Sequence, residues 1–434
     1  MPPSTPTRPQ RVLILSSKLG YQTRAFTDAA KKLNLEIHFG TDRCHKLDDP
    51  WSDNAQALHF ENPQSAAATI ATQLAENRPD AIIALGDRPT ATAAHAARDL
   101  GLPGNPPEAV ELCRNKLHQR EAHHRANLPV PDYFGFSQAE NLDSVIARVK
   151  FPCVLKPLSL SASQGVIRAN NEIEFRAAVR RIRALLESPE IQVLREPNHD
   201  RLLVERYIPG REVAIEALLT NGNLRVLAIF DKPDPLEGPF FEETIYVTPS
   251  RLPDTDQRAL IDCAQRSVTA LGLITGPIHA EFRINEHGPW IIEIAPRPIG
   301  GLCARALRFG NERISLEELI LRHALGMEGN DLQREAAAAG VMMIPVPRSG
   351  VLEDVTGLDL AEKVAGIEAI RITARPHDYI AAWPEGNSYL GFIFSSSETP
   401  EAAEAALRSA HAKLNFTLTP RLPVKHPVTG RVPR

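Results

Sequence analysis

The chain has 434 residues, of which 49 are basic and 53 acidic, and its formal net charge is −4. This length indicates two or three domains, and the balanced charge, without a basic tail or a run of like charges, does not favour a nucleic-acid-binding protein. No apolar signal core and no stretch of about eighteen apolar residues occur, so we expect a cytoplasmic protein that does not enter a membrane.

The cysteines form no metal-binding or disulfide motif. They lie far apart, without a CxxC pair or a Cys/His cluster, at Cys44, Cys113, Cys153, Cys263 and Cys303. We expect them to be reduced and buried, as is typical of a cytosolic protein.

The first hundred residues alternate between strand and helix patterns. Apolar runs typical of buried parallel strands lie at 11–17, 35–39 and 80–85. A helix is predicted over 90–100, because Pro89 precedes it and Gly101 follows it. This alternation indicates a small parallel α/β domain that ends near residue 106. The turn at 86–89 lacks the GxGxxG spacing of a dinucleotide site and is interpreted as a simple strand-to-helix turn.

The middle of the chain mixes strands and helices without regular alternation. The pattern predicts helices over 108–127, 171–187 and 316–325, a strand, polar loop and strand over 151–168, and strands over 202–207 and 212–219. An alanine-rich connection is expected at 334–340. These elements indicate an α+β module.

The last part of the chain reads as a further α+β unit. Strand-like runs lie at 341–346, 367–373, 379–383 and 389–395. A helix is predicted over 400–414, with Thr399 as N-cap and Pro400 at the first helical position.

A predicted hairpin carries the strongest functional signal. Its strands are expected at 278–284 and 290–297, with a five-residue turn between them. If Ile284 pairs with Trp290, the register is set. Glu281 then lies opposite Glu293, and both side chains share a face with Arg297.

Two facing carboxylates are expected to bind a cation between them. At about 4 Å they repel by roughly 1 to 4 kcal/mol, so the pairing is unfavourable unless a cation lies between them. Magnesium suits this geometry, because proteins usually hold it with one or two carboxylates together with nucleotide phosphates. The alternative interpretation is a solvated hairpin with two unrelated glutamates.

Two lysines and a polar loop precede the hairpin. Lys116 lies on a predicted helix, and Lys156 ends a buried strand at a proline, where a lysine is costly unless it meets an anion. The loop at 158–166 is rich in serine and contains Gly165, so its backbone N–H groups can turn towards phosphates. Taken singly, each of these features is also typical of a solvated lysine or a surface turn.

A strand over 203–208 is followed by a turn and a second glutamate. Backbone groups in such a segment can pair with an adenine edge, while Glu212, seven residues past Glu205, can accept from ribose hydroxyls. Taken singly, glutamates such as Glu205 and Glu212 are more often ion-pair partners than ligands.

In this order, the features resemble the ATP-grasp superfamily over roughly residues 107–335. Within it the chain is similar to the L-amino-acid ligase group of carboxylate–amine ligases, on the strength of GLPGNP at 101–106, EIAPR at 293–297 and the unit at 340–414. The resemblance implies an α/β and α+β protein with an ATP-grasp fold. Its domains would be an N-terminal Rossmann-like parallel α/β domain (1–106), an ATP-grasp domain with a mobile lid at about 150–205 (107–338) and a C-terminal α+β domain (339–434).

The resemblance also implies roles for single residues. Lys116 and Lys156 would bind the nucleotide phosphates, and a loop with Ser161, Ser163, Gly165 and Val166 would cover them. The adenine would contact Glu205 and the backbone of Arg206 and Ile208. Glu212 would bind the ribose. Glu281 and Glu293 would bind Mg²⁺, with Mn²⁺ as an alternative ion. Arg297 would face the reacting acyl phosphate.

Two positions depart from the family pattern. Many ATP-grasp enzymes have an asparagine two residues after the second glutamate, where this chain has Ala295. The amino-acid ligases tend to carry a glutamate with a histidine three residues on, whereas this chain offers Glu243 and Tyr246. Glu243 is therefore the candidate for positioning or deprotonating an amine.

The implied reaction joins a small carboxylate to an amine, with ATP converted to ADP and phosphate through an acyl phosphate. The substrates would be two amino acids, or an amino acid and another small carboxylate, and the protein could form a homodimer. Two alternatives stay open. One is another ATP-grasp ligase, similar to glycinamide ribonucleotide synthetase or to a carboxylase, and the other is a nucleotide-binding regulatory protein without turnover.

Overall fold

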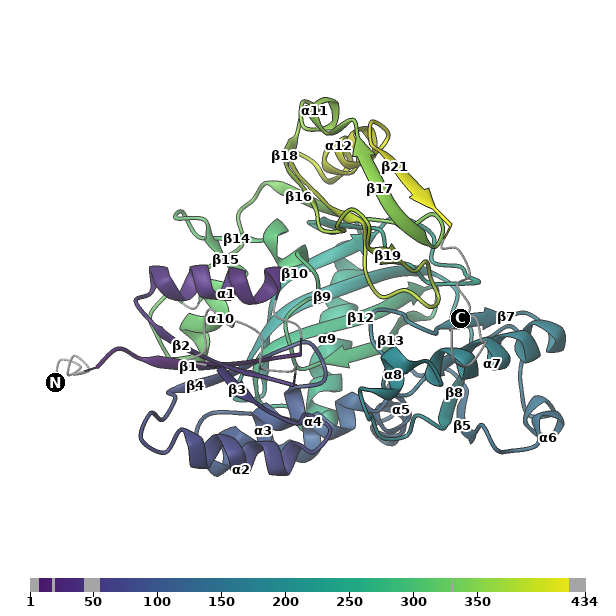
Figure 1. Ribbon diagram of the computed structural model, residues 1–434, viewed down its shortest axis with the longest axis horizontal. Helices are drawn as coiled ribbons and strands as arrows, with labels where there is room; N and C mark the ends of the chain where they lie inside the picture. Colours follow the sequence, from purple (N-terminus) through teal and green to yellow (C-terminus); the bar gives the residue numbers. More distant parts are fainter. Residues whose placement is uncertain (1–7, 18–19, 43–54, 330, 421–434) are drawn as a thin grey trace, which may run out of the picture.

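The computed structural model describes residues 8–17, 20–42, 55–329 and 331–420 (Figure 1). Within these ranges, none of the helices has both the length and the apolarity needed to cross a membrane. Of the predicted free and buried cysteines, four are confirmed, and Cys44 lies outside the described residues.

The N-terminal unit is a parallel α/β sheet, as predicted. Its strands, in the order β3-β2-β1-β4, are β1 (Arg11–Ser16), β2 (Glu36–Thr41), β3 (Ala55–Ala57) and β4 (Ala81–Leu85), and its helices are α1 (Tyr21–Lys32), α2 (Pro63–Gln73) and α3 (Thr90–Asp99). The apolar run of β1 is continuous because both faces of the sheet are covered. Ile14 packs on the side of α1, whereas Leu13 packs with the core residues of α2.

The predicted helix over 108–127 is wrong as a single helix. The structure has α4 (Pro107–Arg114) and α5 (Lys116–Arg125), separated by Asn115. The Asn115 side chain accepts hydrogen bonds from the backbone N–H groups of Leu117 and His118, at 3.0 and 3.3 Å. An asparagine that caps a new helix in this way competes with continuation of the old one. The break makes Lys116 the first residue of α5.

A small antiparallel sheet forms the unit predicted as a lid. Its strands, in the order β5-β8-β6-β7, are β5 (Tyr133–Ser137), β6 (Cys153–Pro157), β7 (Ile167–Ala169) and β8 (Arg201–Arg206), and its helices are α6 (Leu142–Ile146), α7 (Glu172–Leu186) and α8 (Pro189–Gln192). Phe175 and Ile182 of α7 are fully buried in the core that this sheet covers.

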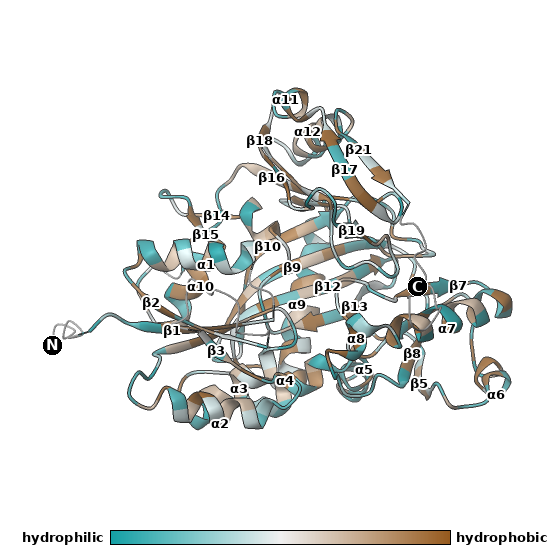
Figure 2. Cartoon of the chain, viewed as in Figure 1, coloured by the Kyte–Doolittle hydropathy of each residue, from teal (hydrophilic) through white to brown (hydrophobic). Residues whose placement is uncertain are grey.

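An antiparallel sheet of eight strands runs through the centre of the molecule, in the order β13-β12-β9-β10-β11-β16-β20-β18 (Figure 1). The strands are β9 (Arg211–Thr220), β10 (Asn223–Lys232), β11 (Ile245–Thr248), β12 (Thr275–Asn285), β13 (Gly288–Ala295), β16 (Ala338–Ile344), β18 (Ile367–Ile372) and β20 (Gly391–Ser397). Figure 2 shows apolar residues along β9, β10 and β12 and hydrophilic residues on α1. The prediction placed a domain boundary at 338/339, and β16 pairs with β11 across it.

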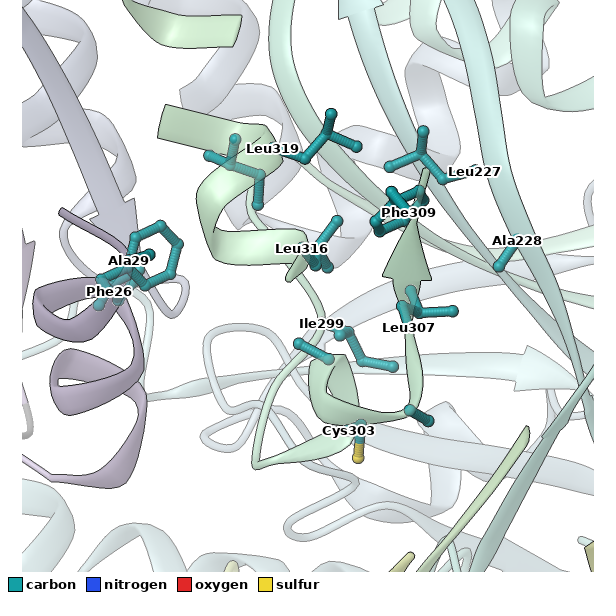
Figure 3. Packing of buried hydrophobic residues seen from close by; sticks show 14 of the residues in the cluster. Phe26, Ala29, Leu227, Ala228, Ile299, Cys303, Leu307, Phe309, Leu316 and Leu319 are labelled. Carbon is teal, nitrogen blue, oxygen red and sulfur yellow. The ribbon is translucent and has the colours of Figure 1, made fainter. Parts of the chain in front are cut away.

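Helices cover both faces of the central sheet. Helix α9 (Asp254–Leu271) packs on one face, and α10 (Leu316–Ala324) and the 3-10 helix η1 (Cys303–Ala306) pack on the other. On the α10 side, Phe26 of α1 shares a core with Leu227 of β10 and Phe309 of the short hairpin β14 (Arg308–Phe309) and β15 (Ile314–Ser315) (Figure 3). This shared core joins the N-terminal unit to the central sheet.

The C-terminal unit adds a second, three-stranded sheet and two helices. They are β17 (Gly350–Thr356), β19 (Tyr379–Ile380), β21 (Asn415–Thr419), α11 (Leu358–Ala361) and α12 (Pro400–His411). The predicted N-cap of α12 is confirmed, because Thr399 Oγ1 accepts from the backbone N–H of Ala402 at 3.2 Å. Strand β16 begins inside the alanine-rich segment that was predicted as a connection, because small residues leave room for α12 to pack on it.

Candidate active site

A cavity of about 610 Å³ lies where the N-terminal unit, the small antiparallel sheet, the central sheet and the C-terminal unit meet. Its size is within the range of small-molecule binding sites. The predicted residues that line it are Lys116, Lys156, Ser161, Ser163, Val166, Glu205, Ile208, Glu212, Glu243, Glu281, Glu293 and Arg297. The tertiary structure thus gathers into one cavity residues that lie up to 181 positions apart, from 116 to 297.

Two of the predicted residues, both of which the structure describes, do not border the cavity. The backbone N–H of Arg206 donates to the carbonyl of Asp132 at 2.8 Å, because β8 pairs with β5, so it is not free to meet an adenine. Gly165 has φ +72° and donates its N–H to the carbonyl of Pro384 at 2.8 Å. In this structure its N–H group is therefore occupied and does not face the cavity.

The hairpin register differs from the prediction, although the two glutamates do face each other. Ile284 pairs with Pro289 rather than with Trp290, because the turn between β12 and β13 is shorter than expected. An irregularity after Glu281 then leaves Ile292 as an extra residue in β13, so Glu281 pairs with Glu293. Such a bulge re-aims side chains next to many active sites.

Helix α5 holds the edge strand β13 in place. Gln119 accepts from the N–H of Ile294 at 2.8 Å and donates to its carbonyl at 3.0 Å. Arg120 donates to the carbonyl of the bulged Ile292 at 2.7 Å. These bonds satisfy backbone groups that an edge strand would otherwise leave unpaired.

Arg120 also forms a buried ion-pair network with Glu205 and Lys156. The carboxylate of Glu205, which is 2% exposed, contacts Nε of Arg120 and lies 2.6 Å from Nζ of Lys156. Burial alone would raise the pKa of Glu205, but the two cations outweigh it and lower the pKa to about 2. The carboxylate therefore positions Lys156 at the cavity wall.

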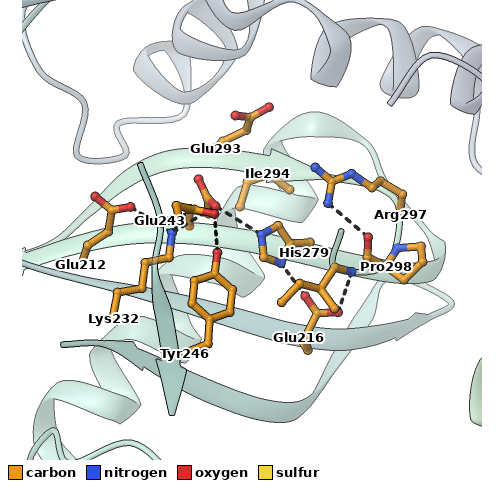
Figure 4. Close-up of polar contacts among 12 residues, drawn as sticks. Glu212, Glu216, Lys232, Glu243, Tyr246, His279, Glu293, Ile294, Arg297 and Pro298 are labelled. Carbon is orange, nitrogen blue, oxygen red and sulfur yellow. Dashed lines mark hydrogen bonds and ion pairs between the residues drawn. The ribbon is translucent and has the colours of Figure 1, made fainter. Parts of the chain in front are cut away.

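A second buried network was not predicted. Lys232, at the end of β10, contacts three carboxylates: Glu212 at 2.9 Å, Glu281 at 3.2 Å and Glu243. Figure 4 shows Lys232 beside Glu243 and Tyr246. The hydroxyl of Tyr246 donates to the other oxygen of Glu243 at 2.8 Å. Burial, Glu281 and Glu212 raise the pKa of Glu243 to about 7 against the opposing effect of Lys232. The sequence signal for Lys232 was a lysine at the end of an apolar strand, the pattern that identified Lys156.

His279 supports Glu281 from the same strand. Its two ring nitrogens contact Glu216 and, at 3.3 Å, Glu281. Burial lowers the pKa of His279, but the carboxylates of Glu216 and Glu281 more than offset this effect and raise the pKa to about 9. His279 and Glu216 are positioning residues that sequence reasoning missed, because an alternating strand pattern does not show which strands become neighbours.

Arg297 is held by a residue of the N-terminal unit. Its Nε and Nη2 atoms lie 2.9 and 3.3 Å from the two oxygens of Asp87. Asp87 follows β4 in the turn that was interpreted as a simple strand-to-helix turn. Ligand sites in parallel α/β sheets lie at the carboxyl ends of strands, and this rule could have identified Asp87 as a site residue.

The loop over the cavity is bound to the C-terminal unit. The indole N–H of Trp383 donates to the carbonyl of Ala162 at 3.0 Å, and Gln164 donates to the carbonyl of Glu385 at 2.7 Å. The side chain of Glu385 pairs with Arg181 of α7. The mobility predicted for the lid therefore depends on the release of these contacts.

Trp383→Phe is expected to increase protease cleavage of the free protein at residues 159–164 about fivefold. The substitution keeps an aromatic side chain but removes the indole N–H and its hydrogen bond, and such a bond is worth about 1 kcal/mol. Trp290→Phe is the matched control, because its indole also donates one bond, to Asn285 at 3.1 Å, but away from the loop. Cleavage should be measured by mass spectrometry with and without ATP and Mg²⁺, which are expected to protect the loop. An unchanged rate in Trp383→Phe would show that this bond does not restrain the loop.

The facing carboxylates fit a magnesium ion. Glu281 and Glu293 supply oxygen ligands from neighbouring strands, and both line the cavity with Lys116, which lies 3.6 Å from Glu293. Ala295 also lines the cavity and offers no side-chain ligand, so Glu281 and Glu293 are the carboxylate ligands that this hairpin provides for a metal ion.

Comparisons with known proteins agree with this geometry. Two family models match the chain, that of an ATP-grasp domain at residues 149–306 and that of the L-amino acid ligase C-terminal domain 2 at residues 342–419. The crystal structure of an L-amino acid ligase from Bacillus licheniformis superposes with a TM-score of 0.80 at 27% identity, covering 95% of this chain and all of that one.

Curated proteins also match parts of this chain in sequence. The uncharacterized protein y4rH of Sinorhizobium fredii is 26% identical over 76% of this chain and 66% of its own length. Alanine–anticapsin ligase of Bacillus amyloliquefaciens is 27% identical over 51% of this chain. The chain spans just under two thirds of the first relative and 49% of the second. From the fold and these matches together, the chain contains an ATP-grasp domain and a domain similar to the C-terminal domain 2 of L-amino acid ligases.

Proposed function

We propose that this protein forms an amide bond between a small carboxylate and an amine, with release of ADP and phosphate. At least one substrate is an amino acid. The observation that carries this proposal is a single cavity that contains two lysines, two facing glutamates and a partly buried arginine. The likeness to an L-amino acid ligase and to alanine–anticapsin ligase supports amino-acid substrates.

The nucleotide would lie between the small antiparallel sheet and the central sheet. Val154, Ile208 and Phe241 offer apolar surface for an adenine, and Lys156 lies beside them on β6. Nζ of Lys116 donates to the carbonyl of Leu160 at 2.8 Å, so this lysine links the covering loop to the hairpin. Both lysines can then meet the phosphates.

Glu212 would be the ribose ligand. It already pairs with Lys232 at 2.9 Å and with Arg283 at 3.0 Å. A carboxylate has about four acceptor sites, so these two partners orient it and leave capacity for ribose hydroxyls.

The first chemical step would transfer the γ-phosphoryl group to the substrate carboxylate. Lys116, Lys156 and Arg297 stabilise the negative charge that spreads over the transferred oxygens. Magnesium bound by Glu281 and Glu293 would supply further charge stabilisation at the phosphates. Arg297 is pre-organised for this task, because Asp87 holds its guanidinium in one orientation.

The second step would release phosphate. The acyl phosphate is labile in water, so the loop at 158–166 must exclude solvent while the amine enters. The amine attacks the acyl carbonyl, the amide forms, and phosphate leaves with one oxygen of the original carboxylate. Glu243 faces the cavity and would position the amine, while Tyr246 holds the carboxylate of Glu243 in place.

An isotope experiment tests this mechanism. The protein is incubated with ATP, Mg²⁺ and pooled amino acids whose carboxylates carry ¹⁸O, and the products are analysed by mass spectrometry. ADP and phosphate are expected in equal amounts, with ¹⁸O in the phosphate. AMP and pyrophosphate as the main products would contradict the proposal.

Arg297→Ala is expected to lower kcat by about 10²- to 10³-fold and to change ATP affinity little. The arginine is assigned to charge that develops at the reacting centre, and one such donor is typically worth this factor. Arg148→Ala, an exposed arginine outside the cavity lining, is the control. A variant that loses only ATP affinity would contradict the assignment of Arg297 to the reacting γ-phosphate.

A further inference from the structure

Two groups of carboxylates in the cavity share one member. Glu281 faces Glu293 across the hairpin, and it also belongs to a trio with Glu212 and Glu243. One oxygen from each member of the trio lies within 4.8 Å of the others, a spacing that suits the ligands of a divalent ion. The site therefore has two positions at which carboxylates converge on a cation.

The trio position is filled by a side chain. Nζ of Lys232 contacts all three carboxylates and lies 5.1 Å from the centre of the Tyr246 ring (Figure 4). The Lys232 side chain is only 3% exposed, and its strand β10 runs between β9 and β11.

The charges at this position favour a permanent cation. Three ionised carboxylates alone would carry a formal charge of −3, which Lys232 reduces to −2, and Arg283 beside Glu212 at 3.0 Å and His279 beside Glu281 at 3.3 Å reduce it further. The three glutamate side chains are only 11 to 17% exposed, and carboxylates shielded to this extent are destabilising without cationic partners, so Lys232 stabilises the trio even when no metal is bound. Lys232 and His279 also contact the same oxygen of Glu281, Oε1, which fixes the orientation of this shared residue.

We propose that the ammonium group of Lys232 takes the place of one divalent metal ion, so that the nucleotide complex binds a single metal ion, at Glu281 and Glu293. This inference rests on the proposed function, since it assumes that ATP binds in the same cavity. Ala295 is consistent with it on independent grounds, because a site with fewer metal ions needs fewer side-chain ligands. Lys232 acts as a positioning residue through Glu281 rather than as a catalytic residue.

Counting bound Mn²⁺ tests the inference. The full chain is titrated with Mn²⁺ by electron paramagnetic resonance, first alone and then with a β,γ-imido analogue of ATP that is not hydrolysed. The parent is expected to bind one Mn²⁺ per chain with the analogue. Lys232→Met keeps the length of the side chain but removes its charge, and it is expected to bind one more Mn²⁺ than the parent in both titrations. Lys150→Met, an exposed lysine paired with Asp132, should match the parent.

Each outcome decides the inference. Two Mn²⁺ per chain in the parent complex would overturn it, and so would equal counts in the parent and a folded Lys232→Met variant. If that variant does not fold, the double variant Lys232→Met with Glu243→Gln restores the formal charge of −2, and the extra Mn²⁺ is still expected. Failure of the analogue to bind, measured by calorimetry, would contradict the proposed function, while the titration with Mn²⁺ alone would still test Lys232.

Discussion

Glu293→Gln is expected to lower ATP turnover at least about a hundredfold while the fold is retained. The substitution removes a negatively charged oxygen ligand from a position that faces Glu281, where a metal ion would neutralise nucleotide phosphates. A hundredfold loss corresponds to about 2.7 kcal/mol of transition-state stabilisation. The variant also loses the charge that pairs with Lys116 at 3.6 Å.

This result should be measured as ADP release at saturating amino acids, with circular dichroism as the check on folding. Glu286→Gln is the matched control, because Glu286 lies on the turn of the same hairpin and its side chain is 77% exposed. Its turnover should equal that of the parent. A Glu293→Gln variant with nearly parental turnover would rule out the assigned metal position.

Glu205→Gln is expected to lower the free energy of unfolding at pH 7 by about 3 kcal/mol. The substitution leaves Arg120 and Lys156 as buried cations without a carboxylate, and breaking such a pair is strongly destabilising. The pKa of Glu205 in the folded protein, about 2, lies below its ordinary value of 4.5. A pKa difference of that size corresponds to about 3 kcal/mol in the free energy of unfolding at pH 7.

The contribution of Glu205 to stability is expected to decrease as the pH falls. Because the folded protein holds Glu205 ionised, its contribution is fully present above pH 4.5 and is lost as the pH falls from 4.5 towards 2. The parent should therefore lose stability over this range, and Glu205→Gln should lose about 3 kcal/mol less. Urea unfolding at several pH values measures both curves.

Glu140→Gln is the control, because Glu140 is an exposed glutamate paired with Arg148 at 3.8 Å, and it should change stability by less than about 0.5 kcal/mol. Parallel curves for parent and Glu205→Gln would show that Glu205 is not the group that titrates.

The facing of Glu281 and Glu293 was predictable although the detailed register was not. Strand patterns show which residues alternate, and they placed both glutamates on one face. They do not show a bulge, because the extra residue at Ile292 is stabilised by Arg120, which comes from a helix more than 170 positions earlier. Two errors, a turn that was too long and a missing bulge, cancelled each other.

The buried networks could not be predicted for a related reason. Lys232 and Asp87 stood in the sequence as single charged residues at the ends of apolar strands. Their significance depends on which other strands and turns lie beside them, since Asp87 meets Arg297 across 210 positions. Helix α5 shows the opposite case, because the break at Asn115 depends only on a side chain that caps its own backbone, and the sequence contained that signal.

The amino-acid sequence by itself determined the parallel α/β start of the chain, the order of lysine, loop, hinge and hairpin, and the presence of an ATP-grasp domain. These features are local, since each depends on a run of neighbouring residues and its periodicity. Only the tertiary structure decided how β16, β20 and β18 extend the central sheet, how Trp383 binds the covering loop, and how Lys232 meets three carboxylates. Those contacts join residues that are distant in the chain, and their energies arise from burial and charge that exist only after the strands have paired.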